Sequence, residues 1–161
     1  MDEIVKAMYS HKVRVRVCGL CFEGASLLMV KHIGLGEKGI LWSPPGGGME
    51  FGETAEQCLM REFEEETGLI IEPVEFLFVN EFKNENLHAI ELFFSVRRTG
   101  GYLKKGNDPE LPSHHQLIKA VKFVTFDELK VMPVENKHNV FRKIDDISDV
   151  LNMRGYFKFW Q

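Results

Sequence analysis

A chain of 161 residues, 44% of them apolar or aromatic, is long enough to fold as one domain around a hydrophobic core. Its formal net charge of -4 argues against a general nucleic-acid-binding surface, and no segment approaches the roughly 18 apolar residues that span a membrane. The first residues show no secretory pattern. We therefore expect a single cytoplasmic domain over residues 1–161, with no DNA or membrane partner.

The first part of the chain alternates between apolar and polar residues, as strands do. Lys12–Glu23 and Ser26–His32 are predicted as paired strands, followed by a glycine-bearing loop at Ile33–Gly39 and a short segment at residues 40–42. Cys18 and Cys21 form a C-x-x-C within the first strand, but residues three apart on a strand point to opposite faces. We interpret both thiols as core residues rather than as a metal or redox site.

The clearest helix is predicted at Thr54–Thr67. Thr54 and Gln57 form a capping-box pattern at its start, and Gly68 is a natural C-terminal stop. Its apolar residues recur at helical spacing, so one side of the helix is expected to pack on the core. These residues are Ala55, Cys58, Leu59 and Phe63.

The second half of the chain combines strands with short helices. Strands are predicted at Leu69–Phe82, Leu87–Arg98 and Leu117–Thr125, and a short helix at Phe126–Met132. Thr99–Ser113 is predicted as a long loop or as a short strand within a loop. A C-terminal helix is predicted from the spacing of Val140, Ile144, Ile147 and Leu151. The whole pattern predicts a mixed α/β arrangement in which helices pack on a sheet.

Acidic residues gather on one face of the helix predicted at Thr54–Thr67. Glu62, Glu65 and Glu66 lie at positions i, i+3 and i+4, where like charges repel by roughly 0.2–0.5 kcal/mol per pair. The negative end of the helix dipole disfavours each by roughly 0.3–1 kcal/mol more. A bound divalent cation removes this conflict, because carboxylate oxygens suit Mg²⁺ or Mn²⁺. The alternative is an ordinary solvated face rich in glutamate.

The spacing around these acids distinguishes the two interpretations. The pattern G-x5-E-x7-R-E-U-x-E-E-x-G-U, with U bulky and apolar, is complete over the 23 residues Gly47–Leu69. It resembles the signature of the Nudix hydrolases. Its fixed positions are Gly47, Glu53, Arg61, Glu62, Glu65, Glu66 and Gly68. The resemblance implies the α/β fold of that family, an α/β/α sandwich with a mixed sheet.

The resemblance also implies an activity, the metal-dependent hydrolysis of a diphosphate linkage. The substrate would be a nucleoside diphosphate derivative such as a nucleotide sugar, ADP-ribose or a nucleoside triphosphate. Mg²⁺, with Mn²⁺ as an alternative, would bind Glu62, Glu65 and Glu66 together with a backbone carbonyl of Gly47 or Gly46. Glu65 or Glu66 would orient or deprotonate the attacking water, while Arg61 and Glu53 would position the acids.

Residues outside the signature are candidates for substrate contacts. The implied contacts are Gly46, Gly48, Trp42 and Glu110, and Glu110 is also the candidate for a further acid supplied by a later loop. Aromatic stacking on a base is open to Trp42 and Phe82, although packing in the core is the commoner role. Other residues that could act on phosphate are His114 and His115, for which an exposed loop is favoured, and Arg14, Arg16, Lys31 and His32, for which a solvated strand face is favoured.

Two other classes of function remain open. One is a ligand-sensing module that keeps the fold without turnover, which the intact set of glutamates argues against. The other is an isomerase acting on a prenyl diphosphate, for which Cys18, Cys21 and Cys58 give no convincing catalytic cysteine. The aromatic ending at Gly155–Gln161 fits no predicted element, and it could pack in the core or form a homodimer contact.

Overall fold

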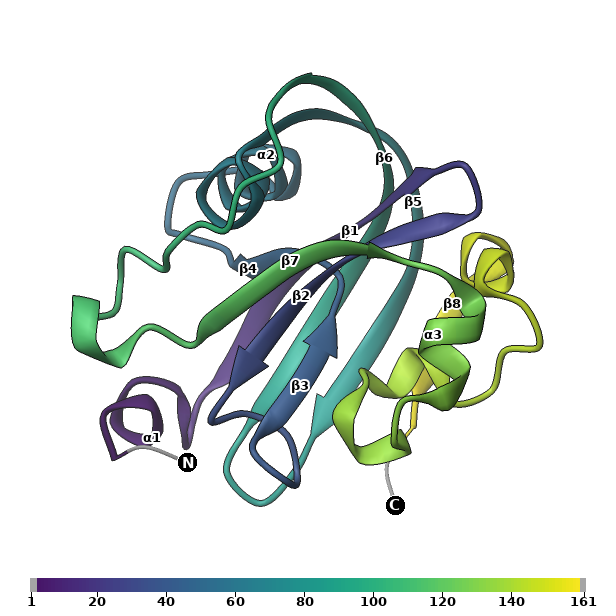
Figure 1. The fold of residues 1–161 in the computed structure, drawn as a ribbon. Coiled ribbons are helices and arrows are strands. Elements are labelled where there is room, and N and C mark those ends of the chain that lie inside the picture. Colours follow the sequence, from purple (N-terminus) through teal and green to yellow (C-terminus); the bar gives the residue numbers. More distant parts are fainter. Residues whose placement is uncertain (1–2, 160–161) are drawn as a thin grey trace.

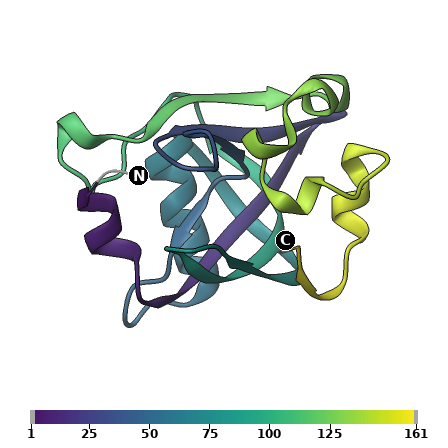
Figure 2. The same cartoon turned by 90° about the horizontal axis from the view of Figure 1, so that it is seen from below.

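The computed structural model describes residues 3–159, which form a mixed eight-stranded sheet with helices on both faces (Figures 1 and 2). The strands are β1 (Val13–Glu23), β2 (Ser26–Ile33), β3 (Ile40–Ser43), β4 (Gly46–Gly48), β5 (Leu69–Lys83), β6 (His88–Gly101), β7 (Ile118–Val124) and β8 (Gly155–Lys158). The α-helices are α1 (Glu3–Tyr9), α2 (Ala55–Thr67) and α3 (Phe126–Val131). Short 3₁₀ helices are η1 (Ser113–His115), η2 (Val134–Asn136), η3 (Asn139–Phe141) and η4 (Ile147–Asn152). None of the described helices is long and apolar enough to cross a membrane.

The sheet opens along the line between β1 and β2. These two strands pair only at their joined ends, where Phe22 lies opposite Leu27 and Glu23 opposite Ser26. Beyond that point β1 pairs with β6 in parallel and with β4 in antiparallel orientation, while β2 pairs with β3 and β7. The glycine strand β4 therefore lies at the opening between the two halves of the sheet.

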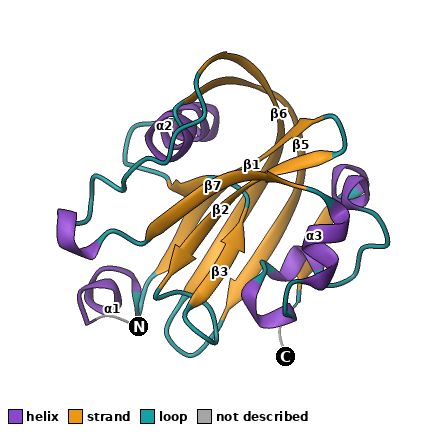
Figure 3. Cartoon of the chain, viewed as in Figure 1, coloured by secondary structure: helices purple, strands orange, loops and turns teal. Residues whose placement is uncertain are grey.

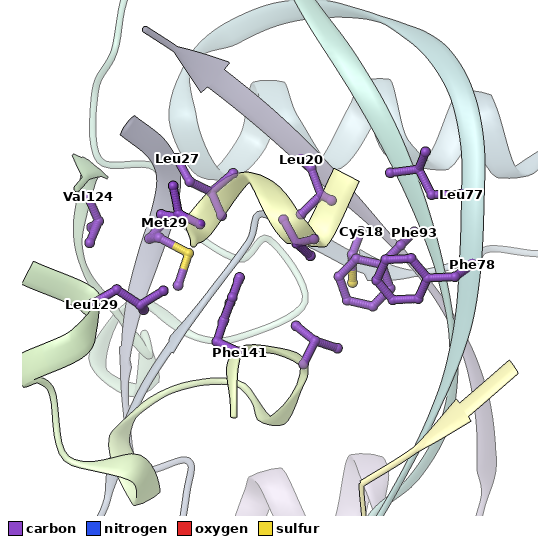
Figure 4. Close-up of a cluster of buried hydrophobic side chains, with 13 residues drawn as sticks. Cys18, Leu20, Leu27, Met29, Leu77, Phe78, Phe93, Val124, Leu129 and Phe141 are labelled. Carbon is purple, nitrogen blue, oxygen red and sulfur yellow. The ribbon is translucent and has the colours of Figure 1, made fainter. Parts of the chain in front are cut away.

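The two faces of β1 belong to two different cores, as the alternation of side chains along a strand requires. Cys18 and Leu20 pack under α3 and the C-terminal segment, in a cluster that includes Phe93 and Phe141 (Figure 4). Val17 and Cys21 pack under α2, with Leu59 and Phe63. The three layers confirm the predicted α/β/α arrangement, and the separate clusters confirm that Cys18 and Cys21 are buried core residues on opposite faces.

The predicted C-terminal helix is wrong. Val140 and Ile147 are buried and Ile144 and Leu151 are partly buried, but Val140 lies in η3 and Ile147 in η4, two separate 3₁₀ helices (Figure 3). Asp146 starts the second turn anew, because its carboxylate accepts from Ser148 N at 2.9 Å. The helical spacing of these apolar residues therefore reflects the packing of two separate 3₁₀ helices against one core, and not one continuous helix.

The sequence patterns predict neither α1 nor β8. The aromatic ending contributes β8, which pairs in parallel with β5 at the edge of the sheet. Phe157 and Phe159 pack against the core below α3, whereas Tyr156 is exposed. Trp160 lies outside the described residues. The packing of Phe157 and Phe159 assigns this part of the tail to the core, and the homodimer remains a prediction.

We expect the contact between α2 and β1 to tolerate no added volume at Gly19. A methyl group there would lie 2.5 Å from Phe63 Cε2 and 3.1 Å from Leu59 Cδ1, both fully buried. Gly19→Ala should lower the free energy of unfolding by roughly 1–3 kcal/mol, measured by urea denaturation. Gly100→Ala is the control, because its nearest contact would be an ordinary 3.6 Å to Ile70. Equal stabilities of the two variants would contradict the expectation.

Candidate active site

Helix α2 forms where the sequence predicts it, for local reasons. Thr54 Oγ1 accepts from Gln57 N at 3.2 Å, and Gln57 Oε1 accepts from Thr54 N at 2.9 Å, so the predicted capping box is present. At the other end Gly68 adopts a left-handed conformation, with φ 72°, and its N–H donates to Glu64 O. Because the apolar face packs on β1, the acids at 62, 65 and 66 face the opening of the sheet.

The glycine strand β4 allows the helix to approach the sheet closely. The Glu62 carboxylate lies so near the Gly47 backbone that any side chain at 47 would collide with it. Gly19 N and Met49 N donate to the carbonyls of Pro45 and Val15, which fixes the ladder between β4 and β1. Since successive carbonyls of a strand point to opposite sides, the Gly47 carbonyl faces β1, as that of Pro45 does.

The carbonyls of Gly46 and Gly48 therefore face away from β1 and toward charged side chains. Gly46 O accepts from Arg16 Nη2 at 3.3 Å, and Gly48 O accepts from Arg61 Nη2 at 3.2 Å. The Gly47 carbonyl is contacted instead by the buried Cys58 Sγ at 3.7 Å. Of the two carbonyls expected from the sequence, this geometry favours Gly46 over Gly47 as a further oxygen ligand.

Arg61 connects the loop before α2 to the acids on the helix. Its guanidinium donates to both oxygens of Glu53, at 3.1 and 2.7 Å, and this pairing is the main cause that lowers the pKa of Glu53 to about 2. The same guanidinium reaches Glu62 at 2.9 Å and Glu65 at 3.3 Å. This is the geometry expected of positioning residues at 53 and 61.

The three signature acids near the end of α2, Glu62, Glu65 and Glu66, lie close together. Burial, followed by repulsion from Glu66, raises the pKa of Glu62 to about 7, and burial also raises the pKa of Glu65. Glu66 is 7% exposed, accepts from Gly46 N at 3.1 Å and lies 3.9 Å from His32 Nε2. Burial and the neighbouring carboxylates thus favour the neutral form of Glu62, although Arg61 lies beside it.

The donor set fits a hard divalent cation. Among the described residues no group of three or more His, Cys, Asp or Glu has the geometry of an assembled metal site. Arg61 contacts Glu62 and Glu65 in this structure. The available ligands are nevertheless all oxygens: three carboxylates on one helical face, two of them with raised pKa, and the Gly46 carbonyl. Oxygen ligands of this kind suit Mg²⁺ and Mn²⁺.

A cavity of about 410 Å³ occupies the opening between the two halves of the sheet. All the acids and glycines predicted as ligands or substrate contacts line it, together with Phe82. These are Gly46, Gly47, Gly48, Glu62, Glu65, Glu66 and Glu110. Arg61 also lines the cavity, whereas Glu53 does not line it and pairs with Arg61.

Trp42, one of the predicted substrate contacts, does not line the cavity. Its ring packs partly buried against the core below α3, with the Lys31 and Lys122 amines 5.9 and 6.0 Å from the ring centre. It is absent from the cavity wall because its neighbour Leu41 points there instead, as alternation along β3 requires. His114 and His115 form part of η1 and do not line the cavity either.

Sequence reasoning missed a buried charged cluster at the cavity floor. Glu91 is 1% exposed and accepts from Arg16 at 3.0 Å, from His138 at 2.9 Å and from Asn80 at 2.9 Å. Burial alone would raise the pKa of Glu91, but His138 and Arg16 outweigh it and lower the pKa to about 2. The signal in the sequence was one acid inside the apolar strand at Leu87–Arg98.

The structure also corrects the interpretation of the basic residues on β1 and β2. Arg14, Arg16 and His32 were expected on a solvated strand face, but all three line the cavity, and His32 is buried.

The cysteines, in contrast, take no part in the site. All three are free and buried, none lines the cavity, and burial is the main cause that raises the pKa of Cys21 to about 11 and of Cys58 to about 12.

Removing the charge of Glu91 should destabilise the protein strongly. Glu91→Gln leaves the Arg16 guanidinium without its carboxylate inside the structure, and loss of one partner of a buried pair costs about 3 kcal/mol. Glu72→Gln, which removes an exposed partner of Arg97, should change stability by less than about 1 kcal/mol. Urea denaturation at neutral pH measures both. A small effect at residue 91 would mean that the cluster contributes little to stability.

Comparison with known proteins agrees with the geometry. The sequence profile of the NUDIX domain matches residues 11–144. The ADP-ribose pyrophosphatase of Methanocaldococcus jannaschii is 31% identical over 127 residues, which cover 78% of this chain and 73% of that protein. The 8-oxo-dGDP phosphatase of Mus musculus is 34% identical over 113 residues, 67% of this chain but only 34% of that longer protein.

Solved structures share the fold at lower sequence identity. A NUDIX hydrolase from Nitrosomonas europaea superposes with a TM-score of 0.62 at 21% identity, covering 77% of this chain and 84% of that one. An ADP-ribose pyrophosphatase from Streptococcus suis gives a TM-score of 0.61 at 17% identity, covering 89% and 98%. The signature is complete in the sequence, its Gly47, Arg61 and the acids at 62, 65 and 66 line one cavity, and the profile matches most of the chain, so this chain belongs to the Nudix hydrolase family.

Proposed function

We propose that this protein hydrolyses the diphosphate linkage of a nucleoside diphosphate derivative in a reaction that depends on Mg²⁺ or Mn²⁺. The observation that carries the proposal is the convergence of Glu62, Glu65 and Glu66 on one cavity beside the Gly46 carbonyl. These oxygens would hold the metal ion. When bound, the ion would offset charge on the phosphoryl oxygens and lower the pKa of a water ligand.

The residues of the chain divide the remaining tasks. Glu66 is held in place by Gly46 N and is nearly enclosed, which suits a ligand of fixed position. The side chain of Glu65 is 27% exposed and makes a single contact with Arg61 at 3.3 Å, so it is better placed to accept a proton from water. Arg61, anchored by both oxygens of Glu53, would keep the acids oriented as they exchange partners.

The cavity and the relatives support this substrate class. The volume of about 410 Å³ lies within the range of roughly 300–1,000 Å³ that small-molecule sites occupy. One relative is named for ADP-ribose and another for 8-oxo-dGDP, both nucleoside diphosphate derivatives. Phe82 lines the cavity and offers an aromatic surface on which a base could stack.

A sensing module without turnover is the second candidate. The ion pairs of Arg61 with Glu62 and Glu65 favour it, because they occupy two of the three acids that a cation needs. Each of these pairs is a single contact, however, whereas Arg61 binds Glu53 through two. Arg61 can therefore remain on Glu53 while the other acids turn to a cation.

Turnover with a panel of ADP-ribose, 8-oxo-dGDP and UDP-sugars in the presence of Mg²⁺ tests the proposal. Products are separated by chromatography, with and without a chelator. Glu65→Gln should lower kcat by roughly 10²- to 10⁴-fold, as loss of a general base does. Glu64→Gln is the matched control, since Glu64 is exposed on the same helix and does not line the cavity. Tight binding of a panel compound with no turnover would identify the sensing module instead.

The metal-free protein should become more stable when Glu62 loses its charge. A carboxyl with a pKa of 4.5 when unfolded and about 7 when folded binds its proton more tightly in the native state. Stability therefore falls as pH rises from 4.5 to about 7 and stays lower above it. Above that pH, Glu62→Gln should add roughly 1–3 kcal/mol, measured by urea denaturation with a chelator present.

The same variant should lose the stabilisation that Mg²⁺ gives to the wild type, because a metal ligand is missing. Thermal unfolding with and without Mg²⁺ measures this difference, with Glu64→Gln again as the control. A Glu62→Gln protein that is less stable without metal, yet still stabilised by Mg²⁺, would contradict the assignment of Glu62 as a crowded ligand.

A further inference from the structure

Two arginines border the glycine strand from the side opposite to the acids. Arg14 and Arg16 are two residues apart on β1, so both side chains emerge on the same face, and both line the cavity. The Arg14 guanidinium lies over Gly48, where an added methyl group would be 3.0 Å from Nη2. Arg16 Nη2 donates to Gly46 O at 3.3 Å. The two positive groups thus lie along the strand against which the Glu62 carboxylate packs.

Only one of these guanidinium groups has a carboxylate partner. Arg16 pairs with Glu91 at 3.0 Å. Within residues 3–159, no carboxylate lies within ion-pair distance of Arg14, and its Cζ lies over the Tyr9 ring, 4.0 Å from the ring centre. Burial, and then the neighbouring charge of Arg16, lower the pKa of Arg14. A partly buried cation beside a second cation is unfavourable unless an anion binds there.

Both groups are held in place by their surroundings. Glu91 and the Gly46 carbonyl fix the two ends of Arg16, while its buried Nε has no hydrogen-bond partner. The Tyr9 ring supports Arg14, and the Tyr9 hydroxyl donates to Glu110 at 3.4 Å, which ties α1 to the loop beyond β6. Arginine presents a planar fork of N–H donors that matches the oxygens of a phosphate.

We propose that Arg14 and Arg16 form the phosphate-binding wall of the cavity, with Arg14 as the free anchor for the diphosphate and Glu91 as the positioning residue for Arg16. The inference rests on the proposed function for the identity of the ligand. Both guanidinium groups would donate charge-assisted hydrogen bonds to the phosphate oxygens. These oxygens would lie between the acids of α2 and the arginines of β1. The alternative is that Arg14 serves only to pack against Tyr9.

Calorimetric titration separates the two roles without any need for turnover. The probes are methylenediphosphonate and the ADP analogue with a methylene bridge between its phosphorus atoms, each titrated with Mg²⁺ and again with a chelator. Arg14→Gln should raise Kd for both probes by about 10- to 100-fold, the usual contribution of a hydrogen bond to a charged group. Arg14→Lys, which keeps the charge without the fork, should lie between the wild type and Arg14→Gln.

Arg98→Gln is the control, because Arg98 is exposed on β6, does not line the cavity, and should leave both affinities unchanged. Equal affinities of wild type and Arg14→Gln, a loss confined to the nucleotide probe, or no binding of either probe by the wild type would overturn the inference. Failure of the proposed function would show differently, as wild-type protein that binds both probes through Arg14 but cleaves no compound of the panel.

Discussion

The close contact between the acidic face of α2 and the glycine strand β4 determines the rest of the site. Because Gly47 has no side chain, the Glu62 carboxylate can lie against the backbone of the sheet, and Glu66 can accept from Gly46 N. Phe63 and Leu59 on the other face of the helix pack against Gly19 of β1, which sets the distance between helix and sheet. Two glycines on neighbouring strands thus fix the depth at which the acids enter the cavity.

The fold follows from the sequence wherever the interactions are local. Helix α2 begins at its capping box and ends at Gly68 as predicted, because caps and apolar spacing act within a few residues. The five predicted strands correspond to β1, β2, β5, β6 and β7, although β6 continues to Gly101 in the predicted loop, whereas β3 and the glycine strand β4 were not predicted as strands. The prediction of a C-terminal helix is wrong because apolar residues at helical spacing can be buried without forming a helix. Asp146 caps a new 3₁₀ helix within the predicted span.

The site follows from the sequence only in part, for the same reason. Spacing within the signature places Glu62, Glu65 and Glu66 on one helical face, and that face lines the cavity. Arg16 and Glu91, in contrast, are 75 residues apart in the chain and meet only because β1 pairs with β6 in parallel. The choice between the Gly46 and Gly47 carbonyls depends in turn on the register of β4 against β1. Strand order and register are long-range properties that no local pattern contains.

The charges of the cavity make most sense as two halves of a site for a metal ion and a phosphate chain. Burial, followed by repulsion from Glu66, raises the pKa of Glu62 on one wall, while burial and a neighbouring cation lower the pKa of Arg14 on the other. Arg61 bridges to two of the acids, yet its firmest attachment is to Glu53, outside the cavity. A divalent cation would offset the first wall and a diphosphate the second. The bound complex would therefore hold fewer unbalanced charges than the protein alone. The same charges that lower the stability of the unliganded protein would thus favour binding of the metal ion and the diphosphate.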